Sequence, residues 1–363
     1  MRIVIDAREL RTTTGRYVER LLHYLQQLDT HNDYTVLLKP TDMSGWQPIS
    51  ERFTPLACPH KEFTFAEQTG LLRQINELHP DLVHFPMVQQ PVLYGGLVVT
   101  TMNDLTTTRF RNPSKNVVVF WLKQRVYVWV NKRVARRSKA LISYTHFVQQ
   151  DVAAFAGISP DKFTVVPLAA DAILDSPETV PELSDTQYVM YTGKPMPHKN
   201  LGRLIDAFVL LQKVHPELRL VLVGKKDGNY ARHEERVRAE GIRNVVFTGF
   251  VSEGQLRWLY ENCAAYVVPS LSEGFGLPGL EAMMHGAPVV SSNATCLPEV
   301  YGDAAIYFDP LDVADMGTKI SPVIDNEALR SNLILRGSAQ AKKYSWRRTA
   351  EQTLAVYEKA LKR

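Results

Sequence analysis

Residues 272–283 read SEGFGLPGLEAM, and this stretch decides the fold that the sequence predicts. The preceding run, AAYVVPS at residues 264–270, is apolar and β-branched, which is typical of a buried strand. After it, residues 282–285 continue a helical pattern, and Pro278 suits the first helical position because a missing N–H costs nothing there. The segment is therefore expected to be a strand, a glycine-rich turn and a helix.

The turn is suited to bind an anion. Gly274 and Gly276 allow backbone conformations that other residues resist. The amides of Phe275, Gly276 and Leu277 are then expected to face a phosphate at the positive end of the helix dipole.

Two interpretations of the turn compete. Residues 274–279 match the dinucleotide pattern G-x-G-x-x-G, which also requires an acidic residue about 20 positions later to hold a ribose. The next strand ends in the uncharged run at 291–293, and this weakens the NAD interpretation. The acids instead flank the turn, with Glu273 at the strand end and Glu281 in the expected first helical turn, where it could reach a sugar hydroxyl. Alternatively, the two glutamates merely cap the turn and complement the helix dipole.

The composition is that of an ordinary globular protein. The chain has 363 residues, 45% hydrophobic and 22% charged, with a net charge of +4, and is long enough for two domains. There is no apolar run of about 18 residues, and the start at residues 1–6 resembles a strand rather than a signal peptide. The three cysteines have no metal-site spacing. A cytoplasmic protein is expected.

Residues 115–139 carry eight lysines and arginines and no acid, interleaved with aromatic residues. Leu122, Val126, Val130 and Val134 recur at helical spacing. One interpretation is a basic helix at an anionic membrane surface. Another is a core-facing valine stripe with a solvated basic face. Nucleic acid is a third option, but no motif elsewhere supports it, and no nucleic-acid partner is expected.

Strand-like runs alternate with helical ones in both halves of the chain, and a polar linker with two prolines lies between them at residues 171–186. This alternation predicts an α/β fold of two doubly wound parallel sheets, whose ligands bind beyond the strand C-termini. The expected strands are Arg2–Asp6, Tyr34–Leu38, Leu82–His84, Leu97–Thr101, Ala140–Ser143, Phe163–Val166, Tyr188–Tyr191, Arg219–Val223, Asn244–Phe247, Ala264–Val268, Pro288–Ser291 and Ala305–Phe308.

Two lysines lie at the expected mouth of the second sheet. Gly193 and Lys194 follow a strand, and Lys199 precedes a helical run. Two cations there can neutralise a departing diphosphate, so that no metal is required. Taken singly, each lysine could equally be a solvated surface charge.

The second half resembles, almost from end to end, family 4 of the retaining glycosyltransferases, which have the two-domain GT-B fold. The matching motifs are YTGKPMPHKN at 191–200, LVLVG at 220–224, VVFTGFVSEGQLRWLY at 245–260, the run from 268 to 300 and GDAAIYFDP at 302–310. Glu273 and Glu281 form the E-x7-E pair of that family. Looser matches in the first half include DAREL at 6–10, TGRYVERLL at 14–22 and VVTTMNDL at 98–105.

The resemblance implies two Rossmann-like domains facing a cleft. An acceptor-binding domain would cover residues 1–172, a nucleotide-sugar-binding domain residues 173–345, and a helix at 346–363 would return to the first domain. Lys194 and Lys199 would hold the donor diphosphate, Glu281 the ribose and Glu273 the donor-sugar hydroxyls. Gly193, Gly274 and the amides of Phe275, Gly276 and Leu277 would complete the donor site.

Two positions in the first half depart from the family pattern. Gly15 would let the backbone approach the reacting centre, but Thr13 replaces a second glycine. Asn103 and Asp104 replace the usual His-Asp pair, and Asn103 can donate a hydrogen bond but cannot carry a proton. Both residues are still assigned to the catalytic set.

The resemblance implies a metal-independent, retaining hexosyltransferase without a cofactor, acting in polysaccharide or glycolipid synthesis. GDP-mannose is the first expected donor, followed by UDP-glucose and dTDP-rhamnose. The acceptor would be a lipid-linked sugar or glycan at the inner face of the plasma membrane. The alternatives are a sugar-nucleotide-binding protein with turnover impaired by Asn103 and a GT-B epimerase.

Overall fold

The computed structural model describes residues 1–12, 15–110 and 117–362. Thr13 and Lys115 lie outside the described residues. The chain divides into two compact units. The N-terminal unit holds the described residues of Met1–Thr108, Asn116–Leu168 and Ser345–Arg363, and the C-terminal unit holds those of Arg109–Lys115 and Ala169–Tyr344. The sequence had suggested limits at 172 and 345.

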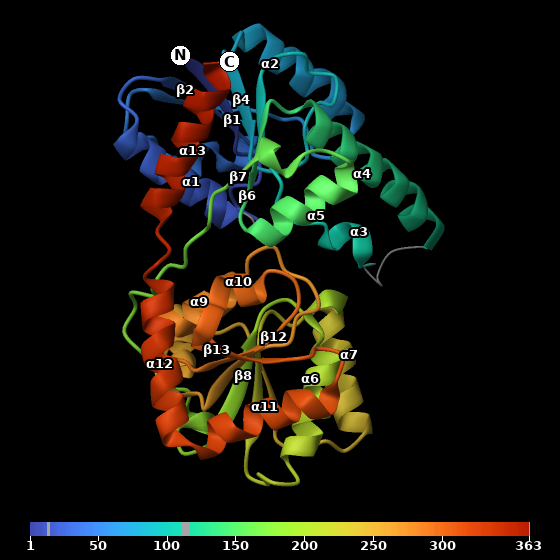
Figure 1. The fold of residues 1–363 in the computed structure, drawn as a ribbon, viewed down its shortest axis with the longest axis vertical. Coiled ribbons are helices and arrows are strands. Elements are labelled where there is room, and N and C mark those ends of the chain that lie inside the picture. Colours follow the sequence, from blue (N-terminus) through green and yellow to red (C-terminus); the bar gives the residue numbers. More distant parts are fainter. Residues whose placement is uncertain (13–14, 111–116, 363) are drawn as a thin grey trace. The chain divides into compact units, whose positions relative to one another are not determined.

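The N-terminal unit is built on a seven-stranded sheet in the order β3-β2-β1-β4-β5-β6-β7, in which all pairs are parallel. Hydrophobic residues fill the central strands, as a sheet covered on both faces requires. The strands are β1 Arg2–Asp6, β2 Asp33–Leu38, β3 Phe53–Ala57, β4 Leu82–Phe85, β5 Val98–Thr101, β6 Ala140–Ser143 and β7 Phe163–Val165. The helices are α1 Gly15–Leu28, α2 Leu72–Leu78, α3 Thr106–Arg109, α4 Val117–Arg137, α5 His146–Ala156 and α13 Trp346–Leu361 (Figure 1).

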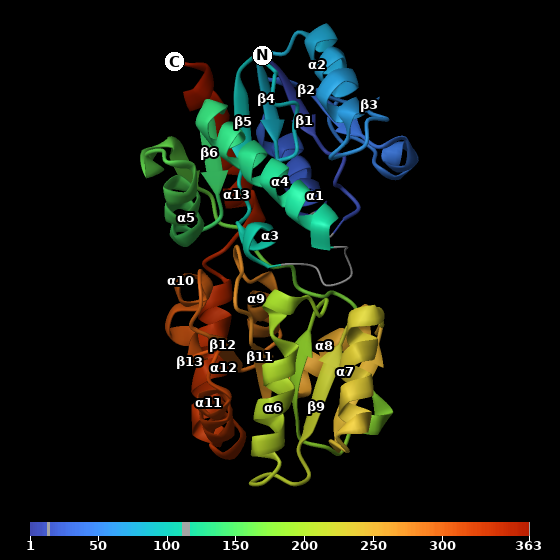
Figure 2. The ribbon, with the colours of Figure 1, turned by 90° about the vertical axis from the view of Figure 1, so that its right-hand side faces the viewer.

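The C-terminal unit contains a six-stranded parallel sheet in the order β10-β9-β8-β11-β12-β13. Its strands are β8 Tyr188–Thr192, β9 Arg219–Val223, β10 Val245–Gly249, β11 Ala265–Val268, β12 Val289–Ser292 and β13 Ala305–Phe308. Its helices are α6 Leu201–Leu211, α7 Gly228–Ala239, α8 Glu253–Asn262, α9 Leu277–Met284, α10 Leu297–Tyr301, α11 Val313–Asp325 and α12 Glu327–Ala341 (Figure 2). The two sheets confirm the predicted α/β class.

Every strand expected from the sequence is present, with ends that differ by at most two residues, but β3 was missed. This strand pairs only with β2, at the edge of the sheet, and contains Pro55. Proline is tolerated at a sheet edge because its missing N–H can face away from the ladder. A short run with a proline lacks the apolar signal of the central strands.

The C-terminal helix α13 packs against α1. Its Tyr357 hydroxyl lies 2.6 Å from Nδ1 of His84, whose ring is fully buried on β4. On the other side of that ring, Nε2 of His84 lies 3.0 Å from the hydroxyl of Thr101 on β5. A buried polar chain therefore joins the last helix to two central strands.

The basic segment is helical, as predicted, and forms α4. Its apolar residues fit neither a wholly core-facing stripe nor a helix that is exposed along its whole length. Val134 is buried and Val130 partly buried against the core, whereas Val126 is 61% exposed. Trp121 and Trp129 are also exposed, at 63% and 53%. The side chain of Leu122 lies outside the described residues. One side of α4 near its C-terminal end thus packs into the unit, while Trp121, Val126 and Trp129 present apolar side chains to solvent.

None of the helices in the described part of the chain is both long enough and apolar enough to cross a membrane.

Candidate functional site

The glycine-rich turn joins β11 to α9 as predicted, but the helix begins one residue earlier than expected. Leu277 is its first residue, so Pro278 occupies the second position, and Glu281 lies in the second turn rather than the first. Gly276 precedes the helix with φ +95°, a conformation that residues with a Cβ rarely adopt.

The turn presents the predicted row of amides. Among the described residues, none accepts a hydrogen bond from the N–H groups of Phe275, Gly276 or Leu277. These groups lie at the positive end of α9, so an anion could bind them without displacing a protein partner. The ring of Phe275 is buried against Tyr344, which holds this part of the turn in place.

Tyr301 packs beneath the turn and explains two of its glycines. The Tyr301 hydroxyl donates a hydrogen bond to the Gly276 carbonyl oxygen at 2.6 Å. A Cβ at Gly276 would lie 2.6 Å from this hydroxyl oxygen, and one at Gly279 would lie 2.3 Å from it. The glycines are therefore required by a buried side chain of α10 as well as by the backbone of the turn. No sequence pattern singled out Tyr301.

Glu273 is held by charge and by hydrogen bonds. Lys199 Nζ lies 2.6 Å from Glu273 Oε1, and the Ser270 hydroxyl donates to the same oxygen at 2.6 Å. Burial raises the pKa of the Glu273 carboxyl, but the charge of Lys199 and the hydrogen bonds from Lys199 and Ser270 outweigh it and bring the pKa below its ordinary value. The sequence predicted separate roles for Glu273 and Lys199, and the structure brings them into one ion pair.

The second lysine of the site is different. Lys194 is exposed, and no described residue forms an ion pair or hydrogen bond with its ammonium group. It follows Gly193, whose carbonyl oxygen accepts a hydrogen bond from Tyr230 at 2.9 Å. Nearby, burial and the charge of Lys199 lower the pKa of His198 to about 4, so its imidazole is neutral at physiological pH. Lys199 is paired with Glu273 and His198 is neutral, so Lys194 is the one of these three described basic residues whose charge is available to an incoming anion.

The predicted residues of the first half belong to the N-terminal unit. Asn103 follows β5, and its Oδ1 accepts a hydrogen bond from the Tyr144 hydroxyl at 3.1 Å. Asp104 accepts from the Thr106 N–H at 2.7 Å, at the start of α3. Gly15 is the first residue of α1, and a Cβ there would lie 2.0 Å from the Leu10 carbonyl oxygen. Gly15 is thus required by the packing of its own loop.

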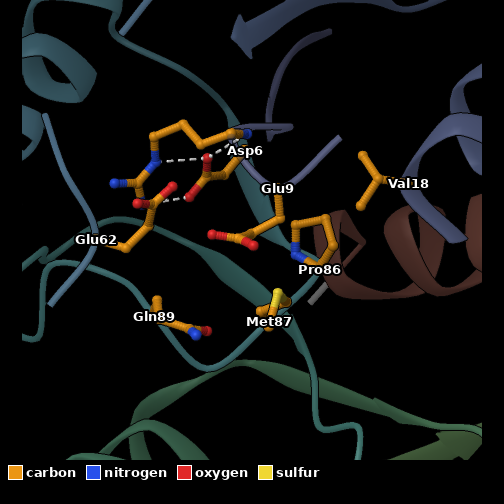
Figure 3. A pocket seen from close by; sticks show the side chains of 8 residues that line it. Asp6, Glu9, Val18, Glu62, Pro86, Met87 and Gln89 are labelled. Atoms are coloured by element: carbon orange, nitrogen blue, oxygen red, sulfur yellow. Dashed lines mark hydrogen bonds and ion pairs between the residues drawn. The ribbon is translucent and has the colours of Figure 1, made fainter. Parts of the chain in front are cut away.

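A buried ion-pair cluster supports that loop (Figure 3). The Arg8 guanidinium, 1% exposed, binds Asp6 at 2.6 Å and Glu67 at 3.0 Å. Next to it is a depression with about 250 Å³ of open space, which includes its solvent-exposed mouth. Its lining is acidic and includes Glu9 and Glu62, whose carboxylates point toward each other in Figure 3. Lys39 lies 2.8 Å from Glu62 and partly neutralises this pair.

Within the described ranges, no cluster of three or more His, Cys, Asp or Glu side chains is arranged to hold a metal ion.

Models of known protein families match both halves of the chain. The model for "Glycosyltransferase Family 4" matches residues 14–172, and the model for "Glycosyl transferases group 1" matches residues 175–340. The chain belongs to this glycosyltransferase family. A curated relative, "O-antigen chain mannosyltransferase B" of Escherichia coli, is 34% identical over 61% of this chain. That alignment also spans 61% of the relative, so the chain is matched to less than two thirds of its length.

Solved structures of other proteins share the architecture. Sucrose-phosphate synthase from Thermosynechococcus elongatus superposes with a TM-score of 0.79 at 18% identity, covering 99% of this chain and 98% of its own. Anabaena HepE in complex with UDP-glucose superposes with a TM-score of 0.72 at 16% identity, covering 99% and 100%. At these identities the likeness shows the fold, and it confirms the predicted GT-B architecture of two Rossmann-like units.

Proposed function

We propose that this glycosyltransferase moves a hexose, with mannose as the first candidate, from a nucleotide-diphosphate sugar to a lipid-linked or glycan acceptor in polysaccharide or glycolipid synthesis. The observation that carries the proposal is the α9 turn. Three amides that have no acceptor among the described residues lie there beside Glu273, whose carboxylate is held by Lys199. Lys194, exposed nearby, is available as a second cation. A diphosphate would bind the amides and Lys194, and a sugar hydroxyl would bind Glu273.

Mannose and a nucleotide donor are supported by the comparisons in different ways. The Escherichia coli relative carries the name mannosyltransferase, and HepE was solved with UDP-glucose. GDP-mannose is therefore the first donor that we propose, with UDP-glucose and dTDP-rhamnose next. Glu281, half-buried on α9, is the proposed ribose ligand.

We further propose retention without a metal ion. The acceptor oxygen would attack the anomeric carbon from the face that the phosphate leaves, and the phosphate oxygen would take the acceptor proton. Lys194, Lys199 and the turn amides would stabilise the departing diphosphate in place of a cation. In this mechanism no protein group acts as the nucleophile, and Glu273, held at Oε1 by Lys199 and Ser270, keeps its proposed role of binding the donor-sugar hydroxyls.

The test is a donor screen on the full chain. GDP-mannose, UDP-glucose and dTDP-rhamnose are incubated with the parent, with Lys194→Met and with Glu273→Gln, with and without EDTA, and release of the nucleotide is measured. We expect release from one donor, unchanged by EDTA and reduced about a hundredfold or more in either variant. No release from any donor, in the parent and in Asn103→His, would contradict the proposal.

We also propose that the N-terminal unit binds an anionic membrane surface through α4. The exposed side chains Trp121, Val126 and Trp129 are joined there by Phe63, which contacts Tyr127 across 6.4 Å between ring centroids and is 66% exposed. Phe63 has φ +59°, a left-handed conformation that is uncommon for an aromatic residue. The apolar patch thus includes a segment far from α4 in sequence.

Charge on the same helix favours an anionic surface. Its exposed cations are Lys123, Arg125, Arg136 and Arg137. Near an anionic leaflet each could contribute about 1 kcal/mol, and the sum falls as salt rises. Interfacial tryptophans would add to this attraction.

Co-sedimentation with vesicles tests the membrane proposal. Binding to phosphatidylglycerol vesicles at low salt is expected, with little binding to phosphatidylcholine vesicles and release at high salt. Trp121→Ala with Trp129→Ala, and Lys123→Gln with Arg125→Gln, should each weaken binding. Phe250→Ala is the matched control because Phe250 is 88% exposed and lies in the other unit. Equal binding by the parent and both paired variants would contradict this role of α4.

A further inference from the structure

The segment that follows β12 adopts a conformation that its sequence disfavours. Thr295 has φ +55°, in the left-handed region. A β-branched residue there is a genuine outlier, and such strain costs on the order of 1–3 kcal/mol and persists only where surrounding structure requires it. Glycine would adopt this conformation with far less strain, so the strain is a consequence of having threonine at this position.

The strained segment contacts the main chain of Glu273. The Glu273 N–H donates a hydrogen bond to Oγ1 of Thr295 at 3.2 Å. The Cys296 thiol donates to the Glu273 carbonyl oxygen at 3.2 Å. Cys296 is fully buried, and burial raises the pKa of its thiol well above the usual range, so the donor keeps its proton. Both backbone polar groups of Glu273, its N–H and its carbonyl oxygen, are therefore bound by the consecutive residues Thr295 and Cys296.

The carboxylate of Glu273 is held by different partners, Lys199 and Ser270. Its main chain and its side chain are thus fixed by separate parts of the unit. A glycine at position 295 would relieve the strain, but it would have no hydroxyl to accept the Glu273 N–H. The Oγ1 atom is therefore the group that explains why threonine stands at this position.

We propose that Thr295 is a positioning residue whose hydroxyl, by accepting the Glu273 N–H, sets the Glu273 main chain and through it the carboxylate that binds the donor sugar. The inference rests on the proposed function. Thr295 lies outside the E-x7-E pair, and by this inference it controls binding of the donor sugar. Binding of the nucleotide diphosphate alone should not depend on Thr295.

Two substitutions separate the hydroxyl from the shape of the side chain. Thr295→Val keeps the branched shape and removes the hydroxyl, whereas Thr295→Ser keeps the hydroxyl. Calorimetry with GDP and with GDP-mannose, or with whichever nucleotide and nucleotide sugar the donor screen identifies, is carried out on both variants and on the parent. Thr318→Val, an exposed threonine of α11, is the matched control.

We expect Thr295→Val to weaken binding of the nucleotide sugar about tenfold or more and to leave binding of the nucleotide within about twofold. Thr295→Ser should restore binding to near the parent value. Equal loss for nucleotide and nucleotide sugar, or equal loss in the Ser and Val variants, would overturn the inference because a general structural role predicts both.

A crystal structure of Thr295→Val separates this inference from the proposed function. If the parent binds no nucleotide sugar, the proposed function fails, but the Glu273–Lys199 contact can still be compared between parent and variant. Displacement of the Glu273 carboxylate from Lys199 supports the positioning role. An unchanged contact of 2.6 Å overturns it.

Discussion

Removal of the Lys199 cation is the most direct perturbation of the site. The substitution Lys199→Met keeps most of the side-chain length and leaves the Glu273 carboxylate without its ion-pair partner. Both side chains are largely shielded from solvent, with exposed fractions of 21% for Lys199 and 14% for Glu273. Of the described partners of Glu273 Oε1, Ser270 would then remain.

The expected magnitude follows from this burial. Breaking a fully buried pair costs about 3–5 kcal/mol, and an exposed pair contributes about 0–1 kcal/mol. For this partly buried pair we expect a loss of about 2–3 kcal/mol at neutral pH. In a unit of this size that loss would lower Tm by about 4–12 °C.

The loss should depend on pH. The pKa of Glu273 is lowered in the folded parent, so the pair contributes stability above the ordinary carboxyl pKa of 4.5, and this contribution is lost as pH falls through the lowered value. In Lys199→Met, burial without the cation raises the pKa of Glu273, and the carboxyl takes up a proton on acidification. The difference between parent and variant should therefore shrink as pH falls from about 7 to about 4.

Thermal unfolding of five proteins, at about pH 7 and about pH 4, measures this effect. The parent and Lys199→Met are compared with Glu273→Gln and with the double variant, so that the coupling between the two residues is obtained. Lys194→Met is the matched control because Lys194 is exposed and has no ion-pair partner among the described residues. If Lys199→Met and Lys194→Met lower Tm equally at neutral pH, or if the difference does not shrink in acid, the reasoning is wrong.

Three further outcomes are expected. Burial lowers the pKa of His84 to about 3. Between about pH 6.5 and pH 3 the unfolded chain therefore binds a proton there that the native chain does not bind. As the pH is lowered through this range, the free energy of unfolding should decrease by up to about 1.4 kcal/mol per pH unit. His84→Gln should flatten this slope in urea unfolding at stepped pH, and parallel slopes would contradict it. Arg8→Met leaves the buried carboxylate of Glu67 without its cation and should lower the free energy of unfolding by about 3–5 kcal/mol at neutral pH, measured by the same assay. A change below about 1 kcal/mol would show that the cluster is not buried as described. Tyr301→Phe removes the hydrogen bond to the Gly276 carbonyl oxygen and should lower the free energy of unfolding by about 1–3 kcal/mol. It should also raise the KM for the nucleotide sugar, and an unchanged KM would show that the turn does not depend on this hydroxyl.

Local patterns in the sequence were sufficient for all of the strands except β3 and for the family. Parallel strands buried on both faces are continuous apolar runs, and β8, β11 and β12 could be placed for that reason. The glycines and glutamates of the α9 turn lie within a few residues of one another, so their spacing alone predicted the turn and its amides. The roles of Asn103 and Glu281 in catalysis and donor binding stay predictions.

Only the tertiary structure decided which side chains meet. Lys199 and Glu273 are 74 positions apart, and they form a pair because the loops after β8 and β11 leave neighbouring strands of one sheet. Tyr301 beneath the turn and the strained Thr295 beside Glu273 likewise come from segments beyond the next strand. Helical and strand periodicity encodes which face of an element is buried, but not which residue of another element it contacts. That contact depends on strand order and register, and so the ion pair and the support of the site became visible only in the folded chain.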